Sequence, residues 1–413
     1  MRLEKKNLPY YVISLFGVGI FSLLSPSQQN DLSVFEFGYA QSIRDSTLSL
    51  NPAFSGFSSP TGIAFLNDTG NNTLVTEKKG NVMLVSDGVV QESPIHTFNV
   101  DFQSERGLLG AEVLKKNGNT FVFFYLTERS LAPPNGDSEN LRNRVYSFVW
   151  DGSKLTNQAL LLDLPALPGP NHDGGKMTIG KDGQLYVVIG DLNHRSKLQN
   201  VENGNDPDLT GSIFRINPLD GSALPDNPFI GTGIPNTDKT FSYGIRNSYG
   251  LTSDPITGKI WDTENGPDYF DEINIVYPGF NSGWRSIMGP VSQSESTVND
   301  LVVFPNSRYS DPIVSWPTPI AITDIEFINT PMLGAEYQNN ILVGDHNLGN
   351  LYFFKVNEAR TGLDVSDAII DSESETDGHI LGDGFGSITD IETGPDGKMY
   401  IVSLREGIVY TIS

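Results

Sequence analysis

Cysteine is absent from all 413 residues of this chain. The absence excludes disulfide bonds, thiolate metal sites, a cysteine nucleophile and a lipoprotein anchor. Histidine is also scarce, with only 5 in the chain. A histidine set among small and polar residues therefore stands out as a candidate functional group.

Positive charge is the second shortage. Lys and Arg total 27 against 50 Asp and Glu, so the formal net charge is −23 at pH 7. Nucleic acid is excluded as a partner, because contacts with phosphates need a basic face. The simplest interpretation of the negative charge is that it keeps the protein soluble. A surface that collects cations is the less favoured interpretation.

A long apolar run is also missing. The longest, Tyr10–Leu24, follows a basic lead and is long for a signal-peptide core but short for a membrane span. Residues 1–24 are therefore interpreted as a signal peptide or an N-terminal anchor, with a buried core segment as the least favoured alternative. Gly38–Ala40 offers a distant small-x-small cleavage site, and 25–45 are interpreted as a polar linker. Either reading predicts a secreted or periplasmic protein, or one on the extracellular face of the membrane.

No long helical periodicity follows. A cassette of apolar strand, Gly/Asn/Asp turn and second apolar strand recurs six times, which predicts an all-β, six-bladed β-propeller over 46–413. A β-sandwich is the alternative, but it would not explain the repeat. A strand near Ile43–Leu50 is expected to complete the last blade and close the ring. The cassettes begin at Pro60, Gly107, Asn171, Gly244, Ile322 and Gly386.

Several chemically able residues fall at equivalent ends of these cassettes, where loops converge on the propeller axis. His172 is a candidate general base, and Asp191 would accept from its other ring nitrogen. Arg246 would hold or polarise an oxygen. The structural alternatives are a turn histidine, a strand-end cap and a bracket between blades. The full set is Glu105, His172, Asp191, Arg246, Asn247, Gly266, Trp316, His346 and the loop Gly384–Thr389.

The loop Glu264–Glu272 is rich in hard oxygen ligands. It offers main-chain carbonyls at Gly266 and Pro267, and carboxylates that include Asp271. Such a set suits Ca²⁺, although the spacing is not that of an EF-hand. A solvated acidic turn is the structural alternative.

Five stretches together resemble the glucose/sorbosone dehydrogenase family, the soluble aldose sugar dehydrogenases that depend on pyrroloquinoline quinone (PQQ) and are six-bladed propellers with Ca²⁺. The resemblance runs from about Pro60 to the C-terminus. Its motifs are NHDGGKMTIGKDGQLYVVIGD, YGIRNSYGL, ENGPDYFDEINIVYPGFNSGW, SERGLLG and GPDGKMYIVS.

The resemblance implies roles for individual residues. His172 corresponds to the base that takes the proton of the anomeric hydroxyl, and Asp191 to the acid that orients it. Arg246 and Asn247 correspond to the pair beside quinone and substrate. The carbonyls of Gly266 and Pro267 correspond to those that hold the catalytic Ca²⁺, with Asp271 as a further candidate metal ligand. Trp316 and Thr318 correspond to the wall of the site.

The chain departs from the family pattern where cations should meet the three carboxylates of PQQ. Ser387 and Thr389 stand where two arginines are expected, and His346 and Asn347 where a lysine is expected. Glu105 replaces a glutamine. At about 1.5–3 kcal/mol per charged hydrogen bond, these changes predict weaker binding unless another loop supplies a cation. Two loops with basic residues could do so: Arg129–Arg144 and Asn193–Lys197.

Two functions from different classes remain. The first is an exported PQQ- and Ca²⁺-dependent oxidoreductase that oxidises the anomeric carbon of a sugar to a lactone and passes electrons to an unknown acceptor. The second is a non-catalytic, Ca²⁺-stabilised propeller that binds a glycan or a protein at the cell surface. A different quinone-like cofactor in the same funnel is a third possibility. The complete His172–Asp191–Arg246 set favours the first.

Overall fold

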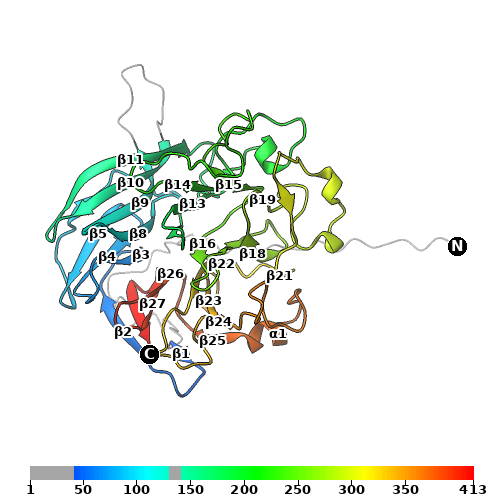
Figure 1. The fold of residues 1–413 in the computed structure, drawn as a ribbon. Coiled ribbons are helices and arrows are strands. Elements are labelled where there is room, and N and C mark those ends of the chain that lie inside the picture. Colours follow the sequence, from blue (N-terminus) through cyan, green and yellow to red (C-terminus); the bar gives the residue numbers. More distant parts are fainter. Residues whose placement is uncertain (1–40, 130–140) are drawn as a thin grey trace, which may run out of the picture. The chain divides into compact units, whose positions relative to one another are not determined.

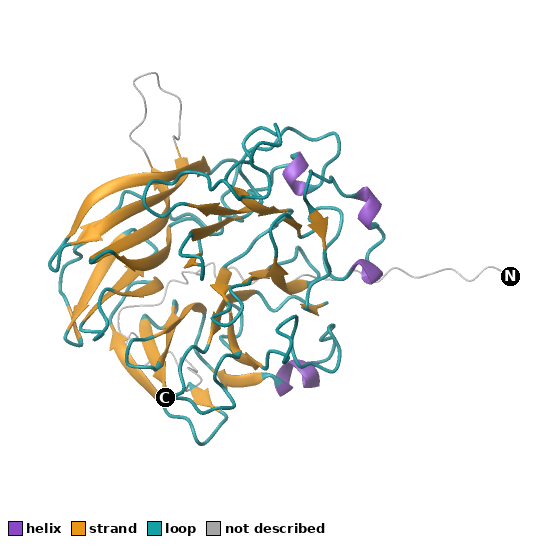
Figure 2. Cartoon of the chain, in the orientation of Figure 1, coloured by secondary structure: helices purple, strands orange, loops and turns teal. Residues whose placement is uncertain are grey.

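The strands of this chain form six sheets. The computed structural model describes residues 41–129 and 141–413, and the sheets lie within these residues (Figures 1 and 2). The inner strand of each sheet contacts the inner strands of the sheets on either side, in the closed order β3–β8–β12–β16–β22–β26–β3. The predicted all-β propeller is therefore confirmed. The segment interpreted as signal peptide or anchor, 1–24, lies outside the described residues.

The sheets follow one another along the chain, and each is mostly an antiparallel meander. In the third sheet, β15 and β19 and then β19 and β20 pair in parallel. The first three sheets are β3 (Pro60–Phe65), β4 (Asn72–Glu77), β5 (Asn81–Ser86), β6 (Val89–Val90) and β7 (His96–Thr97); β8 (Leu108–Lys116), β9 (Asn119–Arg129), β10 (Leu141–Trp150) and β11 (Leu155–Pro165); and β12 (Met177–Ile179), β13 (Leu185–Ile189), β14 (Ser212–Ile216), β15 (Thr240–Tyr243), β19 (Phe280–Asn281) and β20 (Arg308–Tyr309).

The remaining sheets complete the ring. They are β16 (Gly250–Ser253), β17 (Ile260–Glu264), β18 (Asp271–Val276) and β21 (Val314–Trp316); β22 (Ile322–Phe327), β23 (Ile341–Asp345), β24 (Leu351–Phe354), β25 (Ile380–Asp383) and β1 (Ser42–Ile43); and β26 (Ile388–Thr393), β27 (Met399–Ser403), β28 (Ile408–Ile412) and β2 (Leu50–Ser55). Short helices in the described connections are η1 (Lys197–Gln199), η2 (Val291–Gln293), η3 (Val298–Asp300) and α1 (Glu373–Gly378). No helix among the described residues is long and apolar enough to cross a membrane.

The ring closes through a strand from the start of the described chain, as expected, but at different residues. β2 pairs antiparallel with β28, with Leu50 opposite Ile412. The expected strand at Ile43–Leu50 is therefore misplaced, since Ile43 belongs to β1 and pairs with the neighbouring sheet. Pro52 is tolerated in β2 because this is an edge strand. Apolar packing explains why the closing strand lies later in the chain than expected. The ring of Phe54 on β2 stacks on that of Tyr400, with 6.2 Å between ring centroids.

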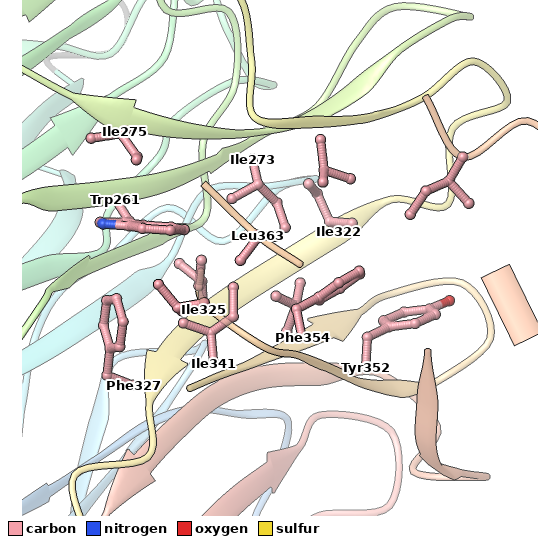
Figure 3. Close-up of a cluster of buried hydrophobic side chains, with 14 of the residues drawn as sticks. Trp261, Ile273, Ile275, Ile322, Ile325, Phe327, Ile341, Tyr352, Phe354 and Leu363 are labelled. Carbon is pink, nitrogen blue, oxygen red and sulfur yellow. The ribbon is translucent and has the colours of Figure 1, made fainter. Parts of the chain in front are cut away.

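Apolar side chains from facing sheets fill the spaces between the blades. Figure 3 shows one such core between the fourth and fifth sheets, where Trp261 and Ile273 face Phe327 and Phe354. Trp261 and Phe327 meet edge to face at 5.5 Å. Such cores explain why central strands read as continuous apolar runs: both of their faces are covered.

The central channel carries charge instead. Lys176, just before β12, donates to Asp324 on β22 at 2.8 Å and to Asp390 on β26. Glu112 of β8 and Glu326 of β22 lie nearby on inner strands. Burial raises the pKa of Glu112 and of Glu326, each to about 7.

These pKa values predict that stability falls as pH rises. Unfolded glutamates titrate near about 4.3, so between roughly pH 4.5 and 7 the folded state binds more protons than the unfolded state and loses stability with each step up in pH. The urea midpoint should be higher at pH 5 than at pH 8. Glu112→Gln should reduce that difference, whereas Glu92→Gln, at an exposed position, should leave it unchanged. If the urea midpoint changed equally with pH in wild type and in both variants, the assignment of this pH dependence to Glu112 would be contradicted.

Candidate functional site

The candidate residues gather at one end of the ring, in the loops that precede the inner strands. Glu105 precedes β8, His172 precedes β12 and Asn247 precedes β16. Hydrogen bonds join them directly. The Glu105 carboxylate accepts from the His172 main-chain N–H at 2.5 Å and from the Asn247 side-chain amide at 3.2 Å. Three blades thus meet at one carboxylate.

Glu105, which stands where the family pattern has a glutamine, also organises its neighbours. The same carboxylate oxygen also accepts from the Tyr249 hydroxyl. Sequence reasoning missed Tyr249, which lies two residues beyond Asn247 in the motif YGIRNSYGL. All three bonds go to Oε2, so a glutamine oxygen in the same position could accept them too, and the carboxylate differs from a glutamine in its negative charge. Glu105 therefore holds His172, Asn247 and Tyr249 in place.

His172 and Asp191 form a buried pair, as the sequence predicted. Nδ1 of His172 lies 2.6 Å from Oδ1 of Asp191, and both residues are at most 8% exposed. Burial opposes ionisation of Asp191, but the hydrogen bond and charge of His172 and further donors lower its pKa overall. An ionised Asp191 can only accept, so Nδ1 of His172 carries the proton of this bond, and in the neutral imidazole Nε2 is the acceptor nitrogen.

Two more donors hold Asp191. Its Oδ1 accepts from the Asn193 main-chain N–H at 2.8 Å, and its Oδ2 accepts from the indole N–H of Trp284 at 2.7 Å. Trp284 is not among the residues predicted from the sequence, although it ends the motif ENGPDYFDEINIVYPGFNSGW. Its ring lies under the Arg246 guanidinium, 5.3 Å from the centroid. Trp284 thus links the histidine's partner to the arginine.

Arg246 and Asn247 leave polar atoms unsatisfied. Arg246 donates from Nη1 to the Asn265 carbonyl at 2.7 Å, but its buried Nε has no partner among the described residues. Oδ1 of Asn247 is likewise buried and unpaired there. Buried groups without partners are costly, and each one calls for an explanation. Arg246 and Asn247 therefore each keep one hydrogen-bonding atom that the described residues do not use.

The predicted metal loop divides into two parts. The carbonyls of Gly266 and Pro267 accept no hydrogen bond from the described residues and are open acceptors. Asp271 differs from its expected role: one oxygen accepts from the Gly266 N–H at 3.1 Å, and the other from Ile320 and Ala321 N–H at 2.9 and 2.7 Å. Asp271 therefore braces the loop rather than presenting a free ligand.

Gly266 is required by the tightness of this loop, because a Cβ there would collide with the carbonyls of Tyr269 and Phe270. Its own carbonyl and that of Pro267 supply only part of a Ca²⁺ shell, which needs 6–8 oxygens. Among residues 41–129 and 141–413, no group of three His, Cys, Asp or Glu side chains is arranged to hold a metal. The loop thus offers two main-chain oxygens, fewer than a Ca²⁺ shell needs.

Three carboxylates lie buried behind this loop. Glu264 and Glu272 are opposite each other on β17 and β18, and Asp262 lies two residues before Glu264. Burial raises the pKa of each, that of Glu264 to about 7, and repulsion from Glu264 adds to the rise for the other two. Glu264 accepts the Arg246 main-chain N–H at 2.6 Å. Alternation along β17 could have shown that Asp262 and Glu264 share a face.

The proposed anion-binding positions form a second group. Nδ1 of His346 lies 2.5 Å from the Ser387 hydroxyl, and Thr389 donates to the Pro60 carbonyl at 3.1 Å. Asn347 is exposed in the same turn as His346. None of these side chains carries a permanent positive charge, so the shortage of cations inferred from the sequence persists at these positions.

Trp316 and Thr318 do not join either group. Trp316 is 1% exposed and packs against Tyr352 and Phe354 in the core between the fourth and fifth sheets. Thr318 is exposed. Trp316 thus lies in the interior in this structure, and its indole N–H is buried without a partner among the described residues.

The two basic loops are engaged elsewhere. Arg129 pairs with Asp101 at 2.6 Å, and Lys197 with Asp206 at 2.7 Å. His194 uses both ring nitrogens, on Asp208 and on the Leu167 carbonyl. Residues 130–140 lie outside the described part of the chain. Arg129, Lys197 and His194 therefore serve local contacts, whereas the exposed Arg195 makes no side-chain hydrogen bond or ion pair among the described residues.

Fold and site together define a propeller with a buried histidine–aspartate pair and a polar, partly unsatisfied centre at one end. The sequence profile of the Glucose / Sorbosone dehydrogenase family matches residues 57–410, and the chain belongs to this family. The resemblance inferred from the motifs is thereby confirmed.

Individual proteins of similar sequence support the assignment of the chain to this family. An uncharacterized protein of Synechocystis is 29% identical over 374 residues, covering 85% of this chain and 83% of its own. Aldose sugar dehydrogenase YliI of Escherichia coli is 28% identical over 61% of this chain and 63% of its own. Quinoprotein glucose dehydrogenase B of Acinetobacter calcoaceticus is 30% identical over 46% of this chain and 42% of its own.

Solved structures share the fold. The apo form of the soluble aldose sugar dehydrogenase from E. coli superimposes with a TM-score of 0.68 at 22% identity, covering 89% of this chain and 99% of its own. The PQQ-bound aldose sugar dehydrogenase from Streptomyces coelicolor gives a TM-score of 0.64 at 22% identity, covering 89% and 98%.

Asp271→Ala should destabilise the protein strongly, because it leaves several buried N–H donors without an acceptor. At about 1–3 kcal/mol for an unsatisfied buried group, we expect a loss of about 3 kcal/mol or more in the free energy of unfolding, measured by urea denaturation. Asp268→Ala, at an exposed position of the same loop, should change it by less than about 0.5 kcal/mol. If the loss disappears when a chelator is present, Asp271 acts through a metal instead.

Proposed function

We propose that this protein is a PQQ-dependent sugar dehydrogenase that oxidises the anomeric carbon of an aldose to a lactone. The buried His172–Asp191 pair beside the unsatisfied atoms of Arg246 and Asn247 carries the proposal. A base, a fixed cation and open polar atoms at one place are what removal of a proton from a sugar hydroxyl requires. The family and the named dehydrogenases among its relatives support the same class of reaction.

The proton moves by the chain's own residues. Nε2 of His172 takes the proton of the anomeric hydroxyl, and ionised Asp191 stabilises the imidazolium that forms. Arg246 binds an oxygen of substrate or cofactor through its unpaired Nε. A bound quinone would supply the hydride acceptor that oxidation of the anomeric carbon to a lactone requires.

Calcium has a narrower role in this proposal than the sequence suggested. The carbonyls of Gly266 and Pro267 would hold the ion, and Asp271 would keep the loop in the conformation that presents them. A cation there would polarise an oxygen of the quinone as a Lewis acid.

Blade number and location complete the proposal. Counting each hydrogen-bonded sheet as one blade gives six blades, with the β2–β28 pair as the closure. The apolar segment within residues 1–24 would direct export, and the electron acceptor would then lie outside the cytoplasm. The non-catalytic alternative is not favoured, because a surface-binding propeller has no need for a histidine oriented by a buried aspartate.

His172→Gln should abolish dye reduction by aldoses in protein supplied with PQQ and Ca²⁺. Loss of a general base predicts a decrease of about 10²–10⁴-fold in kcat, with unchanged thermal unfolding. His194→Gln is the matched control, because His194 also pairs with an aspartate but uses both ring nitrogens within the protein. Equal activity of the His172 variant and wild type would overturn the proposed mechanism.

A further inference from the structure

Two cations outside the expected positions flank the His346–Ser387 pair. They are Lys78, in the turn between β4 and β5, and Arg405, in the turn between β27 and β28. Neither has a carboxylate within ion-pair distance among the described residues.

Lys78 is held beside Glu105 and Thr389. Its ammonium donates to the Ser104 main-chain carbonyl, one residue before Glu105. Its main-chain N–H donates to the Ser59 carbonyl at 3.0 Å, and the next carbonyl, of Pro60, accepts from Thr389. The half-buried ammonium is bound only by main-chain carbonyls, so its full charge remains available to an anion.

Arg405 is held beside Ser387. The neighbouring Leu404 N–H donates to the Ser387 carbonyl at 2.8 Å, and a Cβ added to Gly386 would lie 3.2 Å from Cβ of Arg405. The Arg405 side chain is exposed and makes no hydrogen bond within the described residues. Its guanidinium is therefore free to reach a ligand over Ser387.

His346 responds to both cations. Desolvation and then the positive charge of Arg405, with a contribution from Lys78, lower the pKa of the His346 imidazole. The ring is consequently neutral near pH 7 and serves as a hydrogen-bonding group. The positive charge at this end of the funnel comes from Lys78 and Arg405, not from the histidine.

We propose that Lys78 and Arg405 bind the carboxylates of the quinone cofactor, in place of cations at positions 346, 387 and 389. The inference rests on the proposed function and adds its anion-recognition residues. Lys78 and Arg405 border the polar group formed by Ser387 and His346, and their two positive charges oppose the repulsion that a trianion meets from nearby carboxylates such as Glu105.

The test is calorimetric titration of PQQ, with Ca²⁺, into the full chain and into Lys78→Met, Arg405→Gln and the double variant. Each single change should raise Kd about tenfold or more, and the double change should raise it further and flatten its dependence on salt. Lys78→Arg should keep most of the affinity. Lys398→Met removes the same charge at an exposed residue paired with Asp396, and should leave Kd unchanged. Thermal unfolding checks that every variant is folded.

The outcomes separate this inference from the proposed function. If wild type and the double variant bind PQQ equally, the cation pair is overturned while the quinoprotein stands. If wild type binds no PQQ, the proposed function fails, and titration with citrate decides about the pair. Citrate binding that the double variant loses would support a carboxylate site at Lys78 and Arg405, and no citrate binding would overturn it.

Discussion

The structure depends on hydrogen bonds to buried carboxylates that tie neighbouring inner strands together near the centre of the ring. The sequence ITDIE occurs twice, on β22 and on β26. Asp324 accepts the Ile391 N–H at 2.7 Å, and Asp390 accepts the Ile63 N–H at 2.7 Å. Lys176 compensates both carboxylates. Because these groups are buried, losing one partner would leave an unsatisfied charge or donor. Blade spacing, and with it the position of every loop at the ends of the inner strands, follows from this interlock.

The site builds on that spacing with two further carboxylates. Glu105 joins three blades by accepting from His172, Asn247 and Tyr249, and Asp191 accepts from His172, Asn193 and Trp284. Both are acceptors surrounded by donors, so they orient neighbouring groups rather than react themselves. The atoms without partners belong to Arg246, which stacks on the Asp191-bound Trp284, and to Asn247, which donates to Glu105. A preorganised site holds its orienting groups rigidly and leaves hydrogen-bonding atoms unpaired where a ligand must bind.

The propeller and the His172–Asp191 pair could be predicted because both depend on local pattern. Repeated strand–turn–strand cassettes predict repeated sheets, and a histidine loop followed by a strand ending in aspartate brings the two to one end of a blade. The closing strand was misplaced to 43–50, since the choice between β1 and β2 depends on packing of Phe54 against Tyr400 from the far end of the chain. Asp271 was expected to bind metal, because composition alone cannot tell which carboxylate already has main-chain donors.

The sequence by itself determined the all-β propeller, the family, the histidine–aspartate pair and the shortage of cations at 346, 387 and 389. Each of these follows from residue type and order along the chain. Only the tertiary structure decided that Glu105 joins three blades, that Trp284 holds Asp191, and that Lys78 and Arg405 flank Ser387. These are contacts between residues up to hundreds of positions apart, and they arise when a ring of sheets brings loops of different blades together. No local pattern records which loops will meet.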